Sequence, residues 1–290
     1  MISVVIPAYN EEHAVADTIS GIMSAMANMG CDQFEILVVD DGSSDGTGDA
    51  AKKAGAKVMR KPQNIGYGHS LKIGIRAATY DTIVITDADG TYPVDKIPEL
   101  IERYNEGFNM VVGARTGPHY RGSAIKGPLR LILKFLVEFS TGRCIPDANS
   151  GLRVFSRIEA MAFFNQLSDG FSFTTSITLG YMLKKKYVSY IEIPYMERIG
   201  KSKVRTFRDS IRTIFFIIGA IVYYTPLKLF LLLSFLLLSI GCLSLLVGLF
   251  YLITTTIMFG IGCILVSLII FSQGLLANFL RQIMISAEKE

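Results

Sequence analysis

The sequence predicts an α/β domain with a mostly parallel sheet, followed by an amphipathic helix and a hairpin of two membrane-spanning helices. Short β-branched runs alternate with helix-like stretches up to about residue 212, which is typical of a parallel sheet with helical crossovers. From residue 213 the chain is almost unbroken Leu, Ile, Phe and Val. Only 19% of its 290 residues are charged, against about 25% in soluble domains. This composition excludes a purely soluble protein, a disordered chain and a disulfide-built secreted domain.

Most of the predicted strands are apolar along their length, as in strands buried on both faces of a sheet. They cover residues 2–6, 35–39, 57–60, 82–86, 110–113 and 187–195. The predicted helices cover residues 12–29, 45–54, 70–78 and 95–105. Open sheets of this kind bind ligands at the carboxyl ends of their strands. Polar clusters at residues 9–11, 40–43 and 87–89 follow three of these ends, so we expect the site there.

Two apolar runs, 229–253 and 257–280, each exceed the roughly 20 residues needed to cross a hydrocarbon core. Only three threonines separate them, so a tight helical hairpin is expected, although two core helices of a soluble domain would also be apolar. Residues 206–224 show the amphipathic pattern of a helix at the membrane surface. Basic residues flank both runs and place the flanks on the cytoplasmic side. They are Arg205, Arg208, Arg212, Lys228, Arg281 and Lys289.

The expected domains are a catalytic-looking domain over residues 1–205, an interfacial helix over 206–226 and the hairpin over 227–290. The first residues lack the basic start of a signal peptide. We therefore expect a multi-pass protein of the cytoplasmic membrane, with the catalytic domain and both termini on the cytoplasmic side. Small residues in the apolar runs permit close helix packing and a homo-oligomer. They are Gly241, Gly248, Gly260 and Gly262.

The charge and the cysteines exclude other classes. A net charge of +4 is too small to indicate a nucleic-acid partner and fits contact with anionic headgroups and phosphates. The four cysteines show no paired spacing, which favours reduced structural thiols. The three histidines form no metal-ligand pattern, so a zinc site is not expected.

The strongest chemical signal is Asp87-Ala-Asp89, directly after a predicted buried strand. Two carboxylates one residue apart can share a hard divalent cation that also binds a diphosphate, because Mg²⁺ takes one or two carboxylates plus substrate phosphates. Surface turns also produce this pattern often. Its position beside two other polar strand ends favours the metal interpretation.

Two further clusters follow the first and second strands. Asp40 could accept hydrogen bonds from a base or a ribose hydroxyl, whereas Asp45 is expected only to cap the next helix. Tyr9 could stack on a base while Asn10 caps the first helix. Glu12 is expected to be solvated.

The ordered motifs of this chain resemble those of family 2 glycosyltransferases. They are Val4-Val-Ile-Pro-Ala-Tyr-Asn-Glu-Glu12, Val38-Val-Asp-Asp-Gly-Ser-Ser-Asp-Gly-Thr47, Asn64-Ile-Gly-Tyr-Gly68 and Asp87-Ala-Asp89. A fifth motif, Asp147-Ala-Asn-Ser-Gly-Leu-Arg153, and the basic segment 198–203 are similar to the polyprenyl-phosphate branch, which contains dolichyl-phosphate mannose synthase and undecaprenyl-phosphate glucosyltransferase. The resemblance covers about residues 2 to 205. It implies a GT-A fold, which is Rossmann-like, and transfer of a sugar from a nucleotide sugar to a polyprenyl phosphate.

The resemblance also implies roles for individual residues on the donor side. Asp87 and Asp89 would bind Mg²⁺ or Mn²⁺ and the diphosphate. The other donor contacts would be Pro7, Tyr9 and Glu11 around the nucleoside, Asp40 on the base or ribose, and Arg198 with Lys203 over the pyrophosphate. The donor sugar and base are not readable from one sequence, and a UDP-sugar is weakly favoured over GDP-mannose.

On the acceptor side, the resemblance implies that Arg115 and Arg130 meet the acceptor phosphate. Arg130 could instead bind lipid headgroups. A phosphate acceptor is already ionised, so the reaction needs groups that stabilise charge rather than a strong base. A single displacement at the sugar C1 would invert its configuration, and Asp147 is then an orienting group. Arg153 could form a structural salt bridge with Asp147.

Two departures from the branch concern the metal and the basic segment. The branch often has Gln two residues after the second metal Asp, where this chain has Thr91. A third metal contact is therefore open. The segment from Arg198 to Lys203 is also slightly short, which leaves its closure geometry open.

Three other functions remain as alternatives. A membrane-anchored nucleotide-sugar sensor or scaffold would bind without catalysis, but it could lose the Asp pair or the basic segment that this chain keeps. A processive polysaccharide synthase would carry a Gln-x-x-Arg-Trp motif and more spans, and this chain has no Trp. A transporter would need ionisable residues within its spans.

Overall fold

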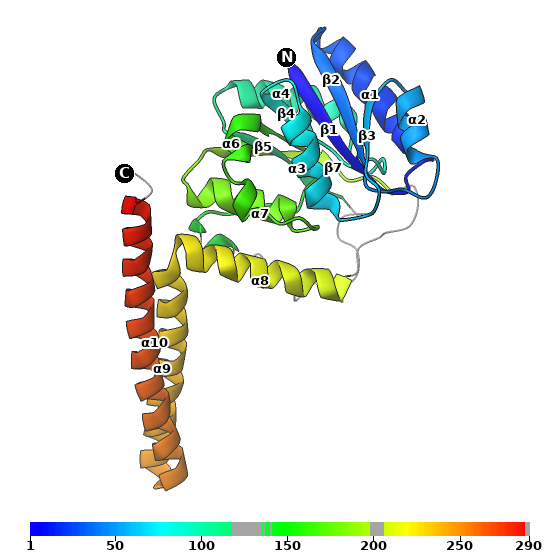
Figure 1. The fold of residues 1–290 in the computed structure, drawn as a ribbon. Helices are drawn as coiled ribbons and strands as arrows, with labels where there is room; N and C mark the ends of the chain where they lie inside the picture. The colour runs from blue at the N-terminus through cyan, green and yellow to red at the C-terminus, as the bar shows by residue number, and fades with distance from the viewer. Residues whose placement is uncertain (118–134, 136, 140, 198–205, 288–290) are drawn as a thin grey trace. The chain divides into compact units, whose positions relative to one another are not determined.

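The computed structural model describes residues 1–290 except 118–134, 136, 140, 198–205 and 288–290. The chain divides into two compact units, Met1–Ile217 and Ile218–Glu290. The first is an α/β domain and the second is dominated by two long apolar helices (Figure 1). The predicted fold class is thereby confirmed, whereas the predicted domain bounds remain predictions.

The domain is built on a seven-stranded sheet in the order β3-β2-β1-β4-β6-β5-β7. Six strands run parallel, and β6 runs antiparallel to both of its neighbours, β4 and β5. The strand bounds are β1 Ile2–Ala8, β2 Phe34–Asp40, β3 Lys57–Arg60, β4 Thr82–Ile85, β5 Met110–Thr116, β6 Arg153–Ser156 and β7 Val188–Pro194. The predicted strands are all present, and β6 is an additional one.

Helices cover both faces of the sheet because the central strands alternate apolar side chains between two cores. Val4 of β1 belongs to the core cluster of α1, α2 and α4, whereas its neighbour Val5 packs in the cluster of α3 and α7. The helix bounds are α1 Val15–Asn28, α2 Thr47–Lys53, α3 Tyr67–Ala77, η1 Val94–Lys96, α4 Ile97–Asn105, α6 Arg157–Met161, η3 Phe164–Gln166 and α7 Phe173–Leu183. The four predicted helices are present, with α1 beginning three residues later than expected.

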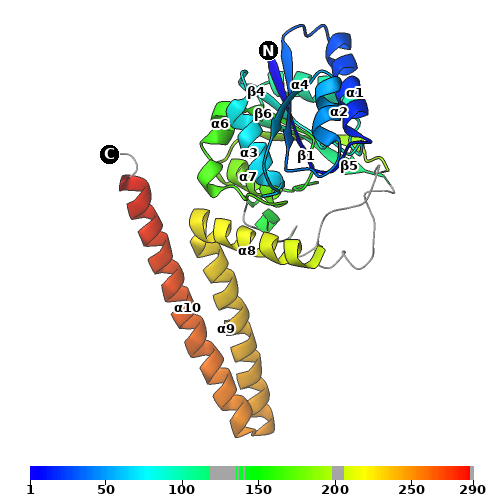
Figure 2. The same cartoon turned by 45° about the vertical axis from the view of Figure 1, so that its right-hand side comes forward.

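The second unit contains α9 (Pro226–Tyr251) and α10 (Thr254–Ala287), which lie side by side in both views (Figures 1 and 2). The preceding helix α8, Thr206–Tyr224, contains the boundary between the units. Both α9 and α10 are long and apolar enough to cross a membrane. The turn between them is residues 252–253 rather than the predicted threonines, because Leu252 takes a left-handed conformation (φ 57°) and Thr254 already starts α10.

Glycines let the two hairpin helices approach backbone to backbone. A Cβ on Gly260 would lie 2.8 Å from the Leu245 nitrogen and 2.9 Å from the Gly241 oxygen. Gly262 lies two residues further along the same helix, and a Cβ there would meet nothing within 4 Å. Ser244 also donates a hydrogen bond to the Thr256 carbonyl (2.9 Å). The hairpin is therefore held by close packing at specific small residues.

We expect Gly260→Leu to destabilise the hairpin by about 1–3 kcal/mol, because the added side chain forces the helix backbones apart. The measurement is thermal unfolding of the full chain in detergent. Gly262→Leu is the matched control and should unfold with the wild type. Equal unfolding temperatures for Gly260→Leu and Gly262→Leu would show that the helices do not pack closely.

A buried carboxylate ties β1, β2 and β3 to the loop before β4. Glu35 accepts hydrogen bonds from Ser3 Oγ (2.7 Å), Lys57 Nζ (2.8 Å) and the Thr79 N–H (2.6 Å). Burial alone would raise its pKa, but these donors outweigh burial and lower the pKa from 4.5 to about 2. The ionised form is thus favoured in the folded state.

Because the folded pKa lies below the ordinary value, the stability from Glu35 is present above pH 4.5 and is lost as the pH falls toward 2. Glu35→Gln should therefore lower the free energy of unfolding at pH 7, on the order of 1–3 kcal/mol. The difference from wild type should shrink on acidification. Unfolding between pH 3 and 7 measures it, with the exposed Glu102→Gln as a control that should follow wild type throughout.

Candidate active site

The polar strand ends meet at one edge of the sheet. Ala8 at the end of β1 pairs with Asp40 at the end of β2, and Val5 pairs with Ile85 at the end of β4. Asp87 follows β4 by two residues. Because all three strands are parallel, the segments after them emerge at the same edge, where the sequence predicts the site.

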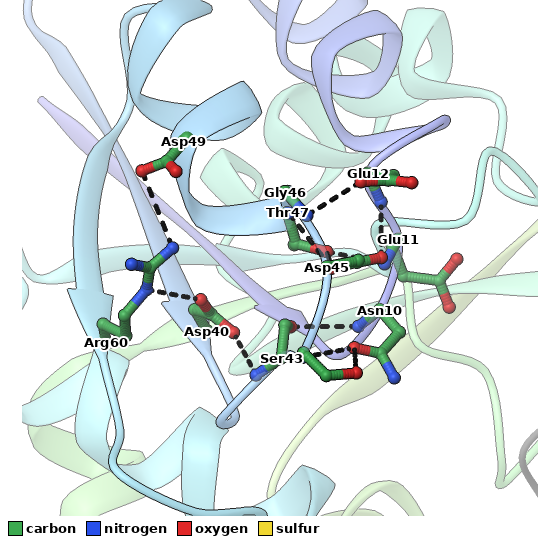
Figure 3. Close-up of polar contacts among 11 residues, drawn as sticks. Asn10, Glu11, Glu12, Asp40, Ser43, Asp45, Gly46, Thr47, Asp49 and Arg60 are labelled. Atoms are coloured by element: carbon green, nitrogen blue, oxygen red, sulfur yellow. Dashed lines mark hydrogen bonds and ion pairs between the residues drawn. The ribbon is translucent and has the colours of Figure 1, made fainter.

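The loops after β1 and β2 are joined by reciprocal hydrogen bonds (Figure 3). Ser43 Oγ accepts the Asn10 N–H (3.0 Å), and Asn10 Oδ1 accepts the Ser44 N–H (2.8 Å). Thr47 Oγ1 accepts the Glu11 N–H (2.8 Å), while the Glu11 carboxylate points away from these contacts (Figure 3). The prediction that Asn10 caps the first helix is wrong, because that helix begins at Val15 and Asn10 bonds the neighbouring loop instead.

The same loops are joined by two carboxylates. Glu12 is partly exposed, as predicted, but its Oε2 also accepts the Gly46 N–H (2.8 Å), so it is not merely solvated. Asp45 accepts the Thr47 N–H (3.1 Å) at the start of α2, as a helix cap would, and it also accepts the Glu12 N–H (3.4 Å). The N-cap of α2 is Gly46, so the prediction that Asp45 only caps this helix is wrong, and Asp45 joins the two loops instead.

Asp40 is held by protein donors. Its side chain is fully buried and accepts hydrogen bonds from the Ser43 N–H (2.9 Å) and from Arg60 Nε (3.1 Å). A Cβ on Gly48 would lie 2.8 Å from Asp40 Oδ2, so this glycine makes room for the pair. The predicted nucleoside residues Tyr9 and Glu11 are half-buried near the same edge, and Pro7 is buried within β1.

The next residue, Asp41, was not predicted as functional and forms a buried ion pair with Lys61. Its carboxylate also accepts the N–H groups of Ile65 and Gly66, both at 3.0 Å. Both charged side chains are more than nine-tenths buried. The pair therefore fixes the segment that leads into α3.

Asp87 and Asp89 each receive a hydrogen bond from a hydroxyl group. Tyr67 donates to Asp87 Oδ1 (2.8 Å), and burial together with the Asp87 charge raises the tyrosine pKa well above its ordinary value. Thr91 donates its hydroxyl (2.6 Å) and its N–H (3.1 Å) to Asp89 Oδ1. Thr91 thus supports the second aspartate.

The two aspartates fit a hard divalent cation. A Cβ on Gly151 would lie 2.8 and 2.9 Å from the two Asp87 carboxylate oxygens, so the glycine lets the Asp87 carboxylate pack directly against the Gly151 backbone. Among the described residues, no group of three or more His, Cys, Asp or Glu side chains could hold a metal. Two carboxylates suffice for Mg²⁺, which takes its other ligands from water and substrate phosphates.

Asp147 lies with Arg115 in a bidentate ion pair. Arg115 Nε and Nη2 lie 2.7 and 3.0 Å from the two carboxylate oxygens, and the guanidinium stands 5.3 Å from the Tyr195 ring centre. Tyr195 packs edge-on against Tyr92, whose hydroxyl accepts the Gly151 N–H (2.6 Å). Contacts therefore connect Asp147 with the Gly151 backbone beside Asp87.

The expected salt bridge between Arg153 and Asp147 is replaced by the Arg115 pair. The fully buried Arg153 instead donates to the Ser150 and Ala148 carbonyls (both 2.7 Å) and to Thr178 Oγ1 (2.6 Å). Its role is structural, because it orders the loop before β6. The remaining predicted site residues, Arg130, Arg198 and Lys203, lie outside the described residues.

Curated relatives are similar to this chain in sequence. The chain is 31% identical over 227 residues to the low-salt glycan biosynthesis hexosyltransferase Agl6 of Haloferax volcanii, covering 75% of this chain and 53% of that protein. It is 35% identical to an undecaprenyl-phosphate 4-deoxy-4-formamido-L-arabinose transferase of Klebsiella pneumoniae (55% and 50% covered). It is 26% identical to a dolichyl-phosphate hexose transferase of Haloferax volcanii (71% and 87% covered). The chain thus spans about half the length of the first two relatives.

Solved structures share the fold. Glucosyl-3-phosphoglycerate synthase from Mycobacterium tuberculosis, in complexes with phosphoglyceric acid, superposes with a TM-score of 0.63 at 22% identity, covering 76% of this chain and 79% of that one. The model of glycosyl transferase family 2 matches residues 3–160. On the match to this family model and the similarity to these relatives, the chain belongs to glycosyl transferase family 2.

Proposed function

We propose that this protein transfers a sugar from a nucleotide sugar to a membrane polyprenyl phosphate. The observation that carries the proposal is the meeting of the Asp87/Asp89 pair with the Arg115–Asp147 pair at one sheet edge, in a chain that also carries two membrane-length helices. The names of two relatives, an undecaprenyl-phosphate and a dolichyl-phosphate transferase, support a polyprenyl phosphate as acceptor.

On the donor side, Asp87 and Asp89 would hold Mg²⁺ or Mn²⁺ with the diphosphate. When bound, the cation would neutralise the charge that develops on the departing diphosphate. Solved neighbours bound to Mn²⁺ and UDP, or to Mg²⁺ and UDP, support this cofactor and a UDP-sugar over GDP-mannose. Other donor contacts in the proposal are Pro7, Tyr9, Glu11, Asp40, Arg198 and Lys203.

On the acceptor side, a phosphate oxygen would attack the sugar C1. The new C1–O bond forms as the bond to the diphosphate breaks, and the electron pair leaves with the nucleoside diphosphate. Because the attacking phosphate is already ionised, Asp147 orients rather than accepts a proton. Arg115, which Asp147 holds, and Arg130 would stabilise the incoming charge. One displacement of this kind inverts the configuration at C1.

The hairpin would hold the protein in the membrane where the acceptor phosphate is presented. A polyprenyl tail stays within the bilayer, so only its phosphate reaches the headgroup level. We place the catalytic domain and both termini on the cytoplasmic side, since basic residues flank both spans. A homo-oligomer through the small residues of the hairpin is part of the proposal.

Transfer is tested with a polyprenyl phosphate, Mn²⁺ or Mg²⁺ and a panel of labelled nucleotide sugars, with label in the organic phase as the readout. We expect one donor to label the lipid. Asp89→Asn should reduce the rate by about 10²- to 10³-fold, because the leaving diphosphate loses its charge stabilisation. The exposed Asp95→Asn is the matched control and should be unaffected. Nucleotide binding without any lipid label would favour a nucleotide-sugar sensor instead.

Arg115→Lys should change the kinetics toward the lipid phosphate acceptor rather than toward the nucleotide-sugar donor. Lysine cannot form the bidentate pair with Asp147, so kcat/KM for the lipid phosphate should fall by about tenfold or more. The KM for the nucleotide sugar should stay within twofold of wild type. Arg76→Lys, an exposed arginine on α3, serves as the control. A change confined to the donor KM would contradict the assignment of Arg115.

A further inference from the structure

Tyr67 stands between two glycines that bring its backbone against the loop at residues 168–170. A Cβ on Gly68 would lie 2.3 Å from the Ser168 carbonyl oxygen, and one on Gly66 would lie 2.8 Å from the Asp169 carbonyl oxygen. The His69 N–H donates to that same Asp169 oxygen (2.9 Å). Both glycines are therefore required for this contact, and they fix where α3 begins.

Side chains hold the same loop from its other end. Lys72, one helical turn further along α3, donates to the Leu167 carbonyl (2.6 Å) and pairs with Asp169 (2.7 Å). The ring of Phe171 stacks on the ring of Tyr67, with 5.9 Å between centres and 13° between planes. The phenol ring of Tyr67 is thus fixed by the loop as well as by its own backbone.

The hydroxyl group of this ring donates to Asp87 Oδ1 at 2.8 Å. The backbone before Tyr67 is fixed in turn by the Asp41 carboxylate, which accepts the Ile65 and Gly66 N–H groups. Asp87 also faces Gly151, at a distance that leaves no room for a Cβ. The carboxylate of Asp87 is therefore held by a fixed hydroxyl donor and lies close to the Gly151 backbone.

We propose that Tyr67 is a positioning residue, which holds the Asp87 carboxylate in the orientation needed to bind a divalent cation together with the nucleotide diphosphate. The inference rests on the proposed function, because Asp87 binds the cation there. Hydrogen-bonding partners of metal ligands orient those ligands, and their loss weakens metal binding by about 10- to 100-fold. Because Tyr67 would act through Asp87, its effect should appear in metal binding first.

The test is Tyr67→Phe in the full chain, which removes the hydroxyl and keeps the ring that stacks on Phe171. Mn²⁺ binding is followed by electron paramagnetic resonance in the presence of UDP, so the readout does not depend on turnover. We expect about 10- to 100-fold weaker Mn²⁺ binding. Transfer activity should recover toward wild type as Mn²⁺ is raised, because the ligand itself is intact.

Tyr181→Phe is the matched control, since the Tyr181 hydroxyl is buried and has no hydrogen-bond partner within the described part of the chain. It should leave Mn²⁺ binding and transfer unchanged. Mn²⁺ binding of Tyr67→Phe within twofold of wild type, alongside a loss in Asp89→Asn, would overturn this inference alone. A wild-type protein that binds UDP but no Mn²⁺ would overturn the metal role of Asp87 and this inference with it. Metal-independent lipid transfer by the wild-type protein would likewise overturn both the metal role of Asp87 and this inference.

Discussion

The arrangement of the site depends on one buried charge pair, between Asp41 and Lys61. The carboxylate of Asp41 joins three segments, because it follows β2, pairs with the lysine that follows β3, and accepts two N–H groups at the start of α3. A buried charge is tolerated only when its partners satisfy it, and removing one partner typically costs about 3–5 kcal/mol. The pair thus couples the conformation of the segment before α3 to the stability of the domain. The position of Tyr67, at the start of α3, depends on the same pair.

Other carboxylates at the sheet edge are likewise held by donors from the protein itself. Asp40 is held by Arg60, Asp89 by Thr91 and Asp147 by Arg115. Because folding fixes these side chains, substrate binding need not supply the free energy to order them. In a reaction that requires charge stabilisation rather than proton transfer, such fixed groups are the main catalytic resource.

The sequence predicts the parallel strands and the three polar strand ends because both are local patterns. It does not predict which donor holds each carboxylate, since Tyr67 and Asp87 are 20 residues apart and Arg115 and Asp147 are 32 apart. Two arginines could have paired with Asp147, and burial among backbone carbonyls decides the role of Arg153. The sequence also does not predict α7, because its residues are buried on every side and so lack the apolar stripe that marks an amphipathic helix.

The antiparallel direction of β6 explains how the two halves of the site come together. In a parallel strand, the residues that precede it would lie at the opposite edge of the sheet from Asp87. Because β6 runs the other way, Arg153 at its start pairs with Ile85 at the end of β4. The loop that precedes Arg153, with Asp147 and Gly151, is therefore brought to the edge where the parallel strands end. One reversed strand of four residues thus brings the loop of Asp147 to the edge of Asp87 and Asp89, where we propose that the acceptor and the cation bind.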